Sequence, residues 1–203
     1  MNEVIEKVED NKTKLNLTKV STNIKKNQKI IAIQNLLMYF FISAFLGWVL
    51  ETIFAVMVGN NEKRGFLYSP ICPIYGLGAI LLVYIDNILK RKKVKNDFIK
   101  FMAFAVSFTT LEYLSSLSLE LLFNQRWWDY SGLVLNIYGR VALIYSITFG
   151  IIGIVFTKLI KKPILKVIKK IRRKIRTDRL QITINLILIL FIIDIVCSCI
   201  RYG

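Results

Sequence analysis

Long apolar runs alternate along the chain with short charged segments. Three runs contain no Asp, Glu, Lys or Arg, and two more are interrupted only by Glu112 and Glu120 or by Asp194. The five runs span residues 30–50, 65–85, 101–123, 141–157 and 180–200. A helix crosses a bilayer core with about 20 apolar residues, and backbone polar groups cannot stay unpaired in lipid. The pattern therefore predicts an all-α, polytopic membrane bundle of about five transmembrane helices.

The first 29 residues differ from the rest of the chain, because they are polar and rich in Lys and Asn. A secretory signal peptide needs an apolar core followed by a small-residue cleavage site, and this segment has neither. We expect residues 1–29 to form a disordered or loosely helical cytoplasmic tail, and residues 30–203 to form the transmembrane domain.

The basic residues predict the orientation. Of the 29 Lys and Arg, seven lie in the tail, six in residues 90–100 and eleven in residues 158–179, while only five lie on the opposite side. The positive-inside rule then places the N-terminus in the cytoplasm and the C-terminus outside. A net charge of +16 could also indicate nucleic-acid binding. Because the charges flank apolar spans and no nucleic-acid motif is present, membrane lipids are the expected partner and nucleic acid is not.

Residues 158–179 show a second pattern. Apolar residues recur at helical spacing while Lys and Arg occupy the opposite face, and Pro163 suits a first helical turn. The apolar positions are Ile160, Ile164, Val167, Ile168, Ile171 and Ile175. This pattern predicts a basic amphipathic helix on the anionic inner leaflet. The alternatives are a plain basic loop and a helix that docks a cytoplasmic partner.

Several chemistries have no support in the sequence. The chain has no histidine, and its cysteines, Cys72, Cys197 and Cys199, form no C-x-x-C pair. Neither a zinc site nor catalysis through a histidine base is therefore expected, and no cofactor is implied. No phosphate-binding loop of Walker type occurs, so any ATP hydrolysis requires another chain. Catalytic activity of the chain itself is not expected, although the sequence leaves it open.

Ionisable residues within or beside the apolar runs are the best functional candidates, because burying them in a membrane costs free energy. With the predicted orientation, five of them fall in the outer half of the protein: Glu51, Glu112, Glu120, Arg140 and Asp194. They would line a polar cavity open to the outside. In the alternative interpretation, the carboxylates reach the interface and one ion pair joins two helices.

Two further segments add candidates to this cavity. After the third run, Arg126, Trp127, Trp128, Asp129 and Tyr130 are packed more densely than an interfacial aromatic belt requires. They could cap the cavity or hold a headgroup by cation–π contact. Arg64, Tyr68 and Tyr75 flank two prolines before the second helix. That irregular backbone is tolerated at membrane depth where it lines a cavity.

These segments together resemble one family. The motifs are Gly47–Glu51, Arg64–Tyr68, Cys72–Gly76, Leu111–Tyr113, Arg126–Ser131 and Asn136 with Gly139-Arg140. In this combination they resemble the CmpB family, bacterial membrane proteins classed as ABC-transporter type IV permeases. The resemblance covers residues 47–162. It implies a protein of the bacterial cytoplasmic membrane with a transport role, and it implies no substrate.

Two functions are compatible with these observations. The first is a permease component that exposes the polar cavity to the outside and works with a separate ATPase, either alone or as a homo-oligomer. The second is an intramembrane enzyme or binding protein that acts on a lipid or cell-envelope precursor. In the second case the carboxylates would serve as acid and base, and Arg126 or Arg140 would hold a phosphate.

Overall fold

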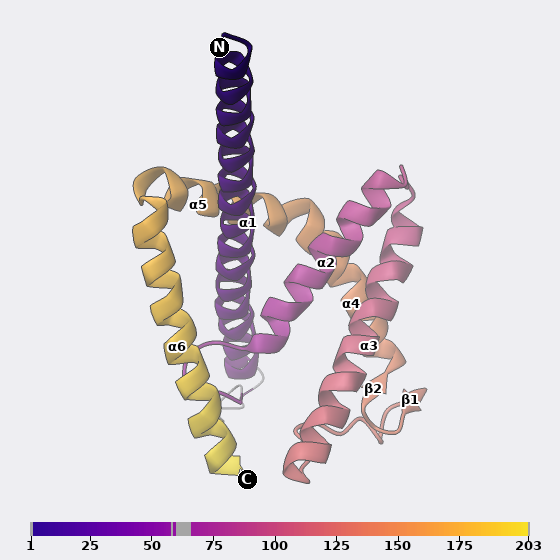
Figure 1. Ribbon diagram of the computed structural model, residues 1–203. Helices are drawn as coiled ribbons and strands as arrows, with labels where there is room; N and C mark the ends of the chain where they lie inside the picture. The colour runs from indigo at the N-terminus through magenta and orange to yellow at the C-terminus, as the bar shows by residue number, and fades with distance from the viewer. Residues whose placement is uncertain (1, 58, 60–65, 203) are drawn as a thin grey trace.

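The computed structural model describes residues 2–57, 59 and 66–202, and it describes side chains within residues 20–57, 59 and 66–201. The described chain is predominantly helical (Figure 1). Its helices are α1 (Asn2–Met57), α2 (Pro73–Arg91), α3 (Asp97–Phe123), α4 (Leu143–Val155), α5 (Lys161–Lys174) and α6 (Thr177–Tyr202). A π-helical turn, η1 (Phe156–Ile160), joins α4 to α5, and the short strands β1 (Asn136–Ile137) and β2 (Val141–Ala142) precede α4.

The predicted class, a polytopic helical membrane protein, is confirmed. Four helical segments of the described chain are long and apolar enough to cross a membrane: Val20–Met57, Pro73–Arg91, Leu143–Lys174 and Thr177–Arg201. The third predicted span lies in α3, which has 27 residues but is less apolar because it carries Glu112, Glu120 and several Ser and Thr. Successive helices alternate in direction, and the two termini lie at opposite ends of the molecule (Figure 1).

Close packing of the helices depends on glycines that face aromatic rings. A Cβ added to Gly153 of α4 would lie 2.6 Å from Cβ of Phe104 in α3, and one added to Gly47 of α1 would lie 2.3 Å from Cβ of Tyr75 in α2. Small residues let membrane helices approach closely where lipid gives no hydrophobic drive for their association. The pairs α3–α4 and α1–α2 are thereby fixed, and large apolar side chains remain on the outside for lipid.

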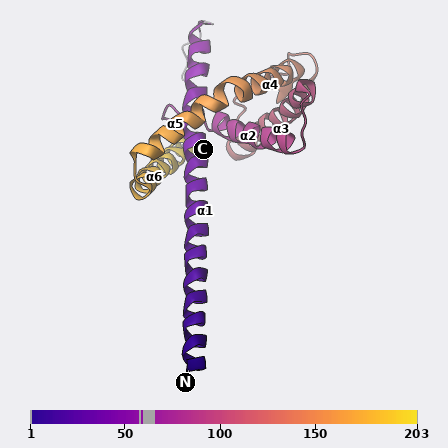
Figure 2. The same cartoon turned by 90° about the horizontal axis from the view of Figure 1, so that it is seen from above.

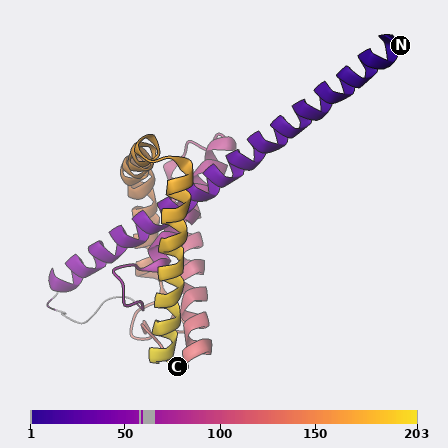
Figure 3. The same cartoon turned by 60° about the vertical axis from the view of Figure 1, so that its left-hand side comes forward.

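Helix α1 includes the predicted tail, because it runs without interruption from Asn2 to Met57. Residues 2–29 are therefore helical, and their cytoplasmic location stays a prediction. The N-terminal half of α1 projects past the other helices, and α1 crosses α6 obliquely (Figures 2 and 3).

The predicted basic helix is confirmed, with shorter bounds than 158–179. It is α5, which ends at Lys174 because Ile175 is extended, and α6 begins at Thr177. Pro163 lies in its first turn and has no N–H to donate to the preceding turn, and the π-helical turn η1 immediately precedes it. Helix α5 lies across the end of the bundle opposite the C-terminus (Figure 1). Ile164 and Ile168 face the core, which they form with residues of α1, α2 and α6.

Candidate functional site

The end of the molecule that carries β1 and β2, here called the hairpin end, holds most of the predicted site residues. Helix α3 stops at Asn124, whose left-handed conformation (φ 51°) ends the helix. The chain then folds back through a tight loop to β1 and β2, which pair Asn136 with Ala142. This loop brings residues 126–130 and Arg140 over the last turns of α3.

Polar side chains hold the loop in shape. Asp129 accepts hydrogen bonds from the amide and the hydroxyl of Ser131, at 2.9 and 2.5 Å, and these donors lower the pKa of Asp129. The Asn136 amide donates to the carbonyls of Ser131 and Leu133 and accepts from the amide of Gly139 at 3.0 Å. Gly139 has φ +68°, and a Cβ there would lie 2.4 Å from an Asp129 oxygen, so this position requires glycine.

Glu120 joins two arginines at this end. Its Oε2 accepts from Arg140 in a very short ion pair and from Nε of Arg126 at 3.2 Å. The Arg140 side chain is 11% exposed and that of Arg126 is 40% exposed, so Arg140 is the more deeply held. The indole of Trp128 donates to the Arg140 carbonyl at 3.0 Å. Arg140 therefore pairs with Glu120, and Trp128 fixes the backbone that presents Arg140.

Glu112 lies deeper in α3 and is only 7% exposed. Its Oε1 accepts from the hydroxyl of Tyr130 at 3.1 Å, and its Oε2 has no hydrogen-bond partner among the described residues. The ring of Tyr130 stacks on Tyr145 with centroids 4.4 Å apart. Burial raises the pKa of Tyr130, so this hydroxyl stays protonated and donates. The loop thus delivers a donor to one oxygen of a buried carboxyl group and leaves the other oxygen unpartnered.

Glu51, from α1, approaches the same region. Its carboxylate accepts side-chain hydrogen bonds from Cys72 and from Tyr75 in the first turn of α2. Residues from α1, α2, α3 and the 126–140 loop converge here.

Asp194 lies in a different contact from the one predicted. Its carboxylate accepts from the backbone amides of Tyr68 and Ser69 at 2.9 and 3.0 Å, and the Arg201 guanidinium lies 5.3 Å from the Tyr68 ring centroid. Helix α6 is on the opposite side of α1 from α3 and α4 (Figures 1 and 2). Asp194 and Tyr68 therefore tie α6 to the segment before α2. Arg64 lies outside the described residues.

The two tryptophans also separate. Trp127 packs edge-on against Phe123 at 5.3 Å and Phe66 at 5.8 Å, while Trp128 contacts the Arg140 backbone. Trp127 therefore belongs to an aromatic group that joins α3 to the segment before α2.

A family model described as "Putative ABC-transporter type IV" (ABC_trans_CmpB) matches residues 38–199. The chain belongs to this family. Comparisons with curated proteins and with solved structures give no match. The family match confirms the resemblance inferred from the motifs, and it includes both the hairpin-end residues and α5.

One polar cluster within the family region was not predicted. Asp86 of α2 accepts from Lys161 at 2.7 Å and from Lys90 at 2.6 Å, and the Asn87 side chain accepts from Lys161 at 3.1 Å. The side chains of Asp86 and Lys161 are 4% and 11% exposed. In the sequence, Asp86 only ends an apolar run and Lys161 is one of eleven cations. The i, i+4 spacing of Asp86 and Lys90 was the one available signal.

Proposed function

We propose that the chain is the membrane-spanning permease component of an ABC-type transporter, and that Glu112 belongs to its solute-binding site. The family supplies the transporter class. The observation that carries the site is the Glu112 carboxyl group, which is buried in a helix and has one oxygen without a partner. A buried polar group without a partner costs free energy, and a donor-bearing solute would remove that cost.

The surrounding groups fit this role. The Tyr130 hydroxyl fixes one oxygen of Glu112, and Glu51 adds a second carboxyl group beside Cys72 and Tyr75. Glu120 is neutralised by Arg126 and Arg140, so its contribution is to hold the loop. We propose that a polar solute with hydrogen-bond donors binds between Glu51 and Glu112, beneath the loop.

The proposed orientation rests on charge. The α5 end carries the basic segments 90–100 and 158–179, and the hairpin end carries few cations, so the hairpin end faces outward in the cytoplasmic membrane of a bacterium. The exposed lysines of α5 are then available to a separate ATPase. Reporter fusions at the two termini test the orientation. An N-terminal reporter inside the cell and a C-terminal reporter outside support it, and two reporters on the same side contradict it.

The function is tested by comparing a deletion strain with its parent. A transport role predicts that a polar solute accumulates on one side of the membrane while lipid composition is unchanged, and that the cloned chain restores the parental distribution. If the solutes are unchanged and a lipid or envelope precursor accumulates instead, the permease proposal is wrong and an intramembrane enzyme takes its place.

A further inference from the structure

Two hollows adjoin at the elbow where α5 turns into α6. One, of about 290 Å³, lies between α1 and α6 and includes Ile30, Ile33 and Gln34 in its wall. The other, of about 540 Å³, is formed by residues 172–178. Thr177 and Asp178 line both. The two hollows therefore share part of their wall, and one lies between transmembrane helices while the other lies at the surface.

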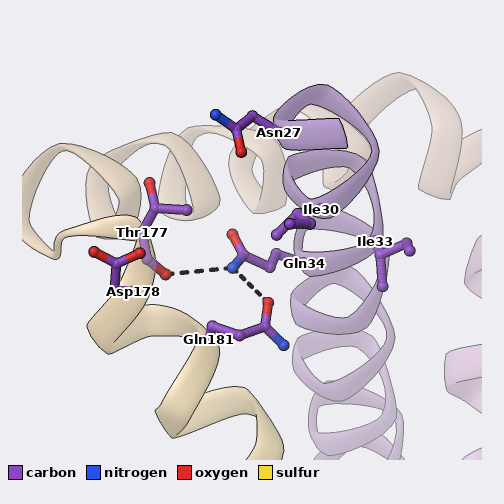
Figure 4. A pocket seen from close by; sticks show the side chains of 7 residues that line it. All are labelled: Asn27, Ile30, Ile33, Gln34, Thr177, Asp178 and Gln181. Carbon is purple, nitrogen blue, oxygen red and sulfur yellow. Dashed lines mark hydrogen bonds between the residues drawn. The ribbon is translucent and has the colours of Figure 1, made fainter. Parts of the chain in front are cut away.

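The hollow between the helices is lined partly by apolar side chains. Ile33 is 56% exposed, and Ile30 lies one turn before it on the same helix. Gln34 is fully buried and points from α1 toward α6, where its Nε2 donates to Gln181 at 2.7 Å and to the Thr177 carbonyl at 3.4 Å (Figure 4). The two isoleucines offer apolar contact, and Asn27, Asp178 and Gln181 add polar groups to the same wall.

The surface hollow is strongly basic. Four cations line it, Arg172, Arg173, Lys174 and Arg176, against the single carboxylate of Asp178. Arg176 and Asp178 are 3.7 Å apart, and both side chains are more than four-fifths exposed. Such an exposed pair is weak, so the hollow keeps most of its positive charge.

Arg172 is held in place by neutral groups. It donates to the Ile31 carbonyl at 2.8 Å, to Oε1 of Gln34 at 3.0 Å and, in a very short contact, to Oδ1 of Asn35. These partners position the guanidinium and do not neutralise it. A partly buried cation that is fixed but uncompensated favours an anion beside it.

The positions of the two hollows, one between the apolar spans and one on the basic surface, match one class of ligand. The uncharged run of α1 begins at residue 30 and that of α6 at residue 180, so the elbow lies where apolar spans meet the basic face of α5. An anionic phospholipid has a phosphate directly above its acyl chains. We infer that the elbow binds such a lipid, with its phosphate beside Arg172, Arg173 and Arg176 and its first acyl carbons against Ile30 and Ile33. This inference does not depend on the transported solute.

The test uses the whole chain purified in a mild detergent and titrated with phosphatidylglycerol, phosphatidylcholine or inorganic phosphate. Bound lipid is counted by native mass spectrometry, and Tm is measured in parallel, since a ligand of the folded state raises Tm. We expect one phosphatidylglycerol per chain to bind saturably and raise Tm. Phosphatidylcholine and phosphate at the same concentration should do neither.

Two matched triple variants distinguish lipid binding at the elbow from general attraction of lipid to the basic surface of α5. Changing Arg173, Lys174 and Arg176 to Gln should weaken phosphatidylglycerol binding by about a factor of ten or more, because it removes three of the four cations that line the surface hollow. Changing the exposed Lys166, Lys169 and Lys170 to Gln removes the same charge elsewhere on α5 and should leave the single bound lipid in place.

A gain of affinity gives the sharpest test. Asp178→Asn removes the carboxylate that lines the surface hollow, and with it the repulsion of the lipid phosphate. It should therefore tighten phosphatidylglycerol binding several-fold, and misfolding cannot produce such an increase in affinity. Equal losses in the two triple variants would show only diffuse attraction to α5 and would overturn the site. The site would also be overturned if phosphate alone raised Tm as much as the lipid, or if Asp178→Asn weakened binding.

Discussion

Both ends of the bundle contain carboxylates that bridge two cations, but the surroundings differ. At the surface of the α5 end, the exposed Asp97 joins Lys100 and Lys158. At the α5 end, Asp86 joins Lys90 and Lys161 and is almost fully buried. At the hairpin end, Glu120 joins Arg126 and Arg140 and is 28% exposed. Only the hairpin end adds a second, buried carboxyl group, Glu112, with an unpartnered oxygen.

This difference separates a structural ion pair from a candidate binding site. Lys90 and Lys161 neutralise the Asp86 carboxylate, and the contact with Lys161 fixes α2 to the start of α5. This is the role of an ion pair that joins two helices. At the hairpin end, Glu120 and its arginines already serve that purpose. Glu112 is therefore an additional buried carboxyl group that helix joining does not explain, and a role in ligand binding explains it better.

The largest expected effect is at the α5 end. Asp86→Ala leaves Lys161 buried without a counter-charge, a loss of about 3–5 kcal/mol where burial is nearly complete. Thermal or SDS denaturation of the purified protein should show it. Lys166→Ala removes an exposed charged side chain of α5 and is the control, with an expected change within about 0.5 kcal/mol. Similar stabilities for the two variants would mean that Asp86 does not join the helices.

The hairpin end should show an asymmetry between its two arginines. Arg140 is less exposed than Arg126, although both pair with Glu120. Arg140→Ala should lower Tm by a few degrees, roughly two to three times the change for Arg126→Ala, because it removes the better-buried partner. Arg201→Ala should also be milder than Arg140→Ala. Equal effects at Arg126 and Arg140 would contradict the assignment of Arg140 as the anchor.

A smaller effect is expected in the loop backbone. Gly139→Ala places a Cβ against Asp129 and Ser131 at a positive φ, and it should cost about 1–2 kcal/mol. Gly132 lies in the same loop with no atom within 4 Å of an added Cβ, so Gly132→Ala is the matched control. Melting curves of the two variants compare them directly, and an unaffected Gly139→Ala would show that the loop is not held as described.

The smallest expected effect is a dependence of stability on acidic pH that is caused by Asp129. Its folded pKa is lowered by the hydrogen bonds from Ser131, below an unfolded value of about 3.9. The associated stability is fully present above the unfolded value and is lost as pH falls through the folded value. Between about pH 5 and pH 3, Tm should therefore fall less in Asp129→Asn than in the natural chain. Ser131→Ala should give an intermediate slope, and identical slopes would count against this contribution.

The sequence predicted features that depend on composition along one helix. Run length identified membrane helices. The amphipathic period located α5. Its end at Lys174 was missed because Ile175 continues the apolar period, although its backbone is extended.

Features that depend on position around the bundle were not predictable. Asp194 was grouped with Glu112 because both lie at a similar depth, yet depth does not determine which neighbour a helix faces. Helix α6 packs beside α1, and Asp194 contacts the segment before α2. Likewise, Asp86 and Lys161 are 75 residues apart, and only the turn of η1 and α5 over α2 brings them together.

The most direct test of the contrast between the two ends is complementation of the deletion strain with Glu112→Gln and with Asp86→Asn. Glutamine keeps the shape of Glu112 and its contact with Tyr130, so Glu112→Gln should reach normal abundance in the membrane and fail to restore the solute distribution. Asp86→Asn should restore it in proportion to the amount of folded protein present. Full restoration by Glu112→Gln at normal abundance would contradict the assignment of the hairpin end as the functional site.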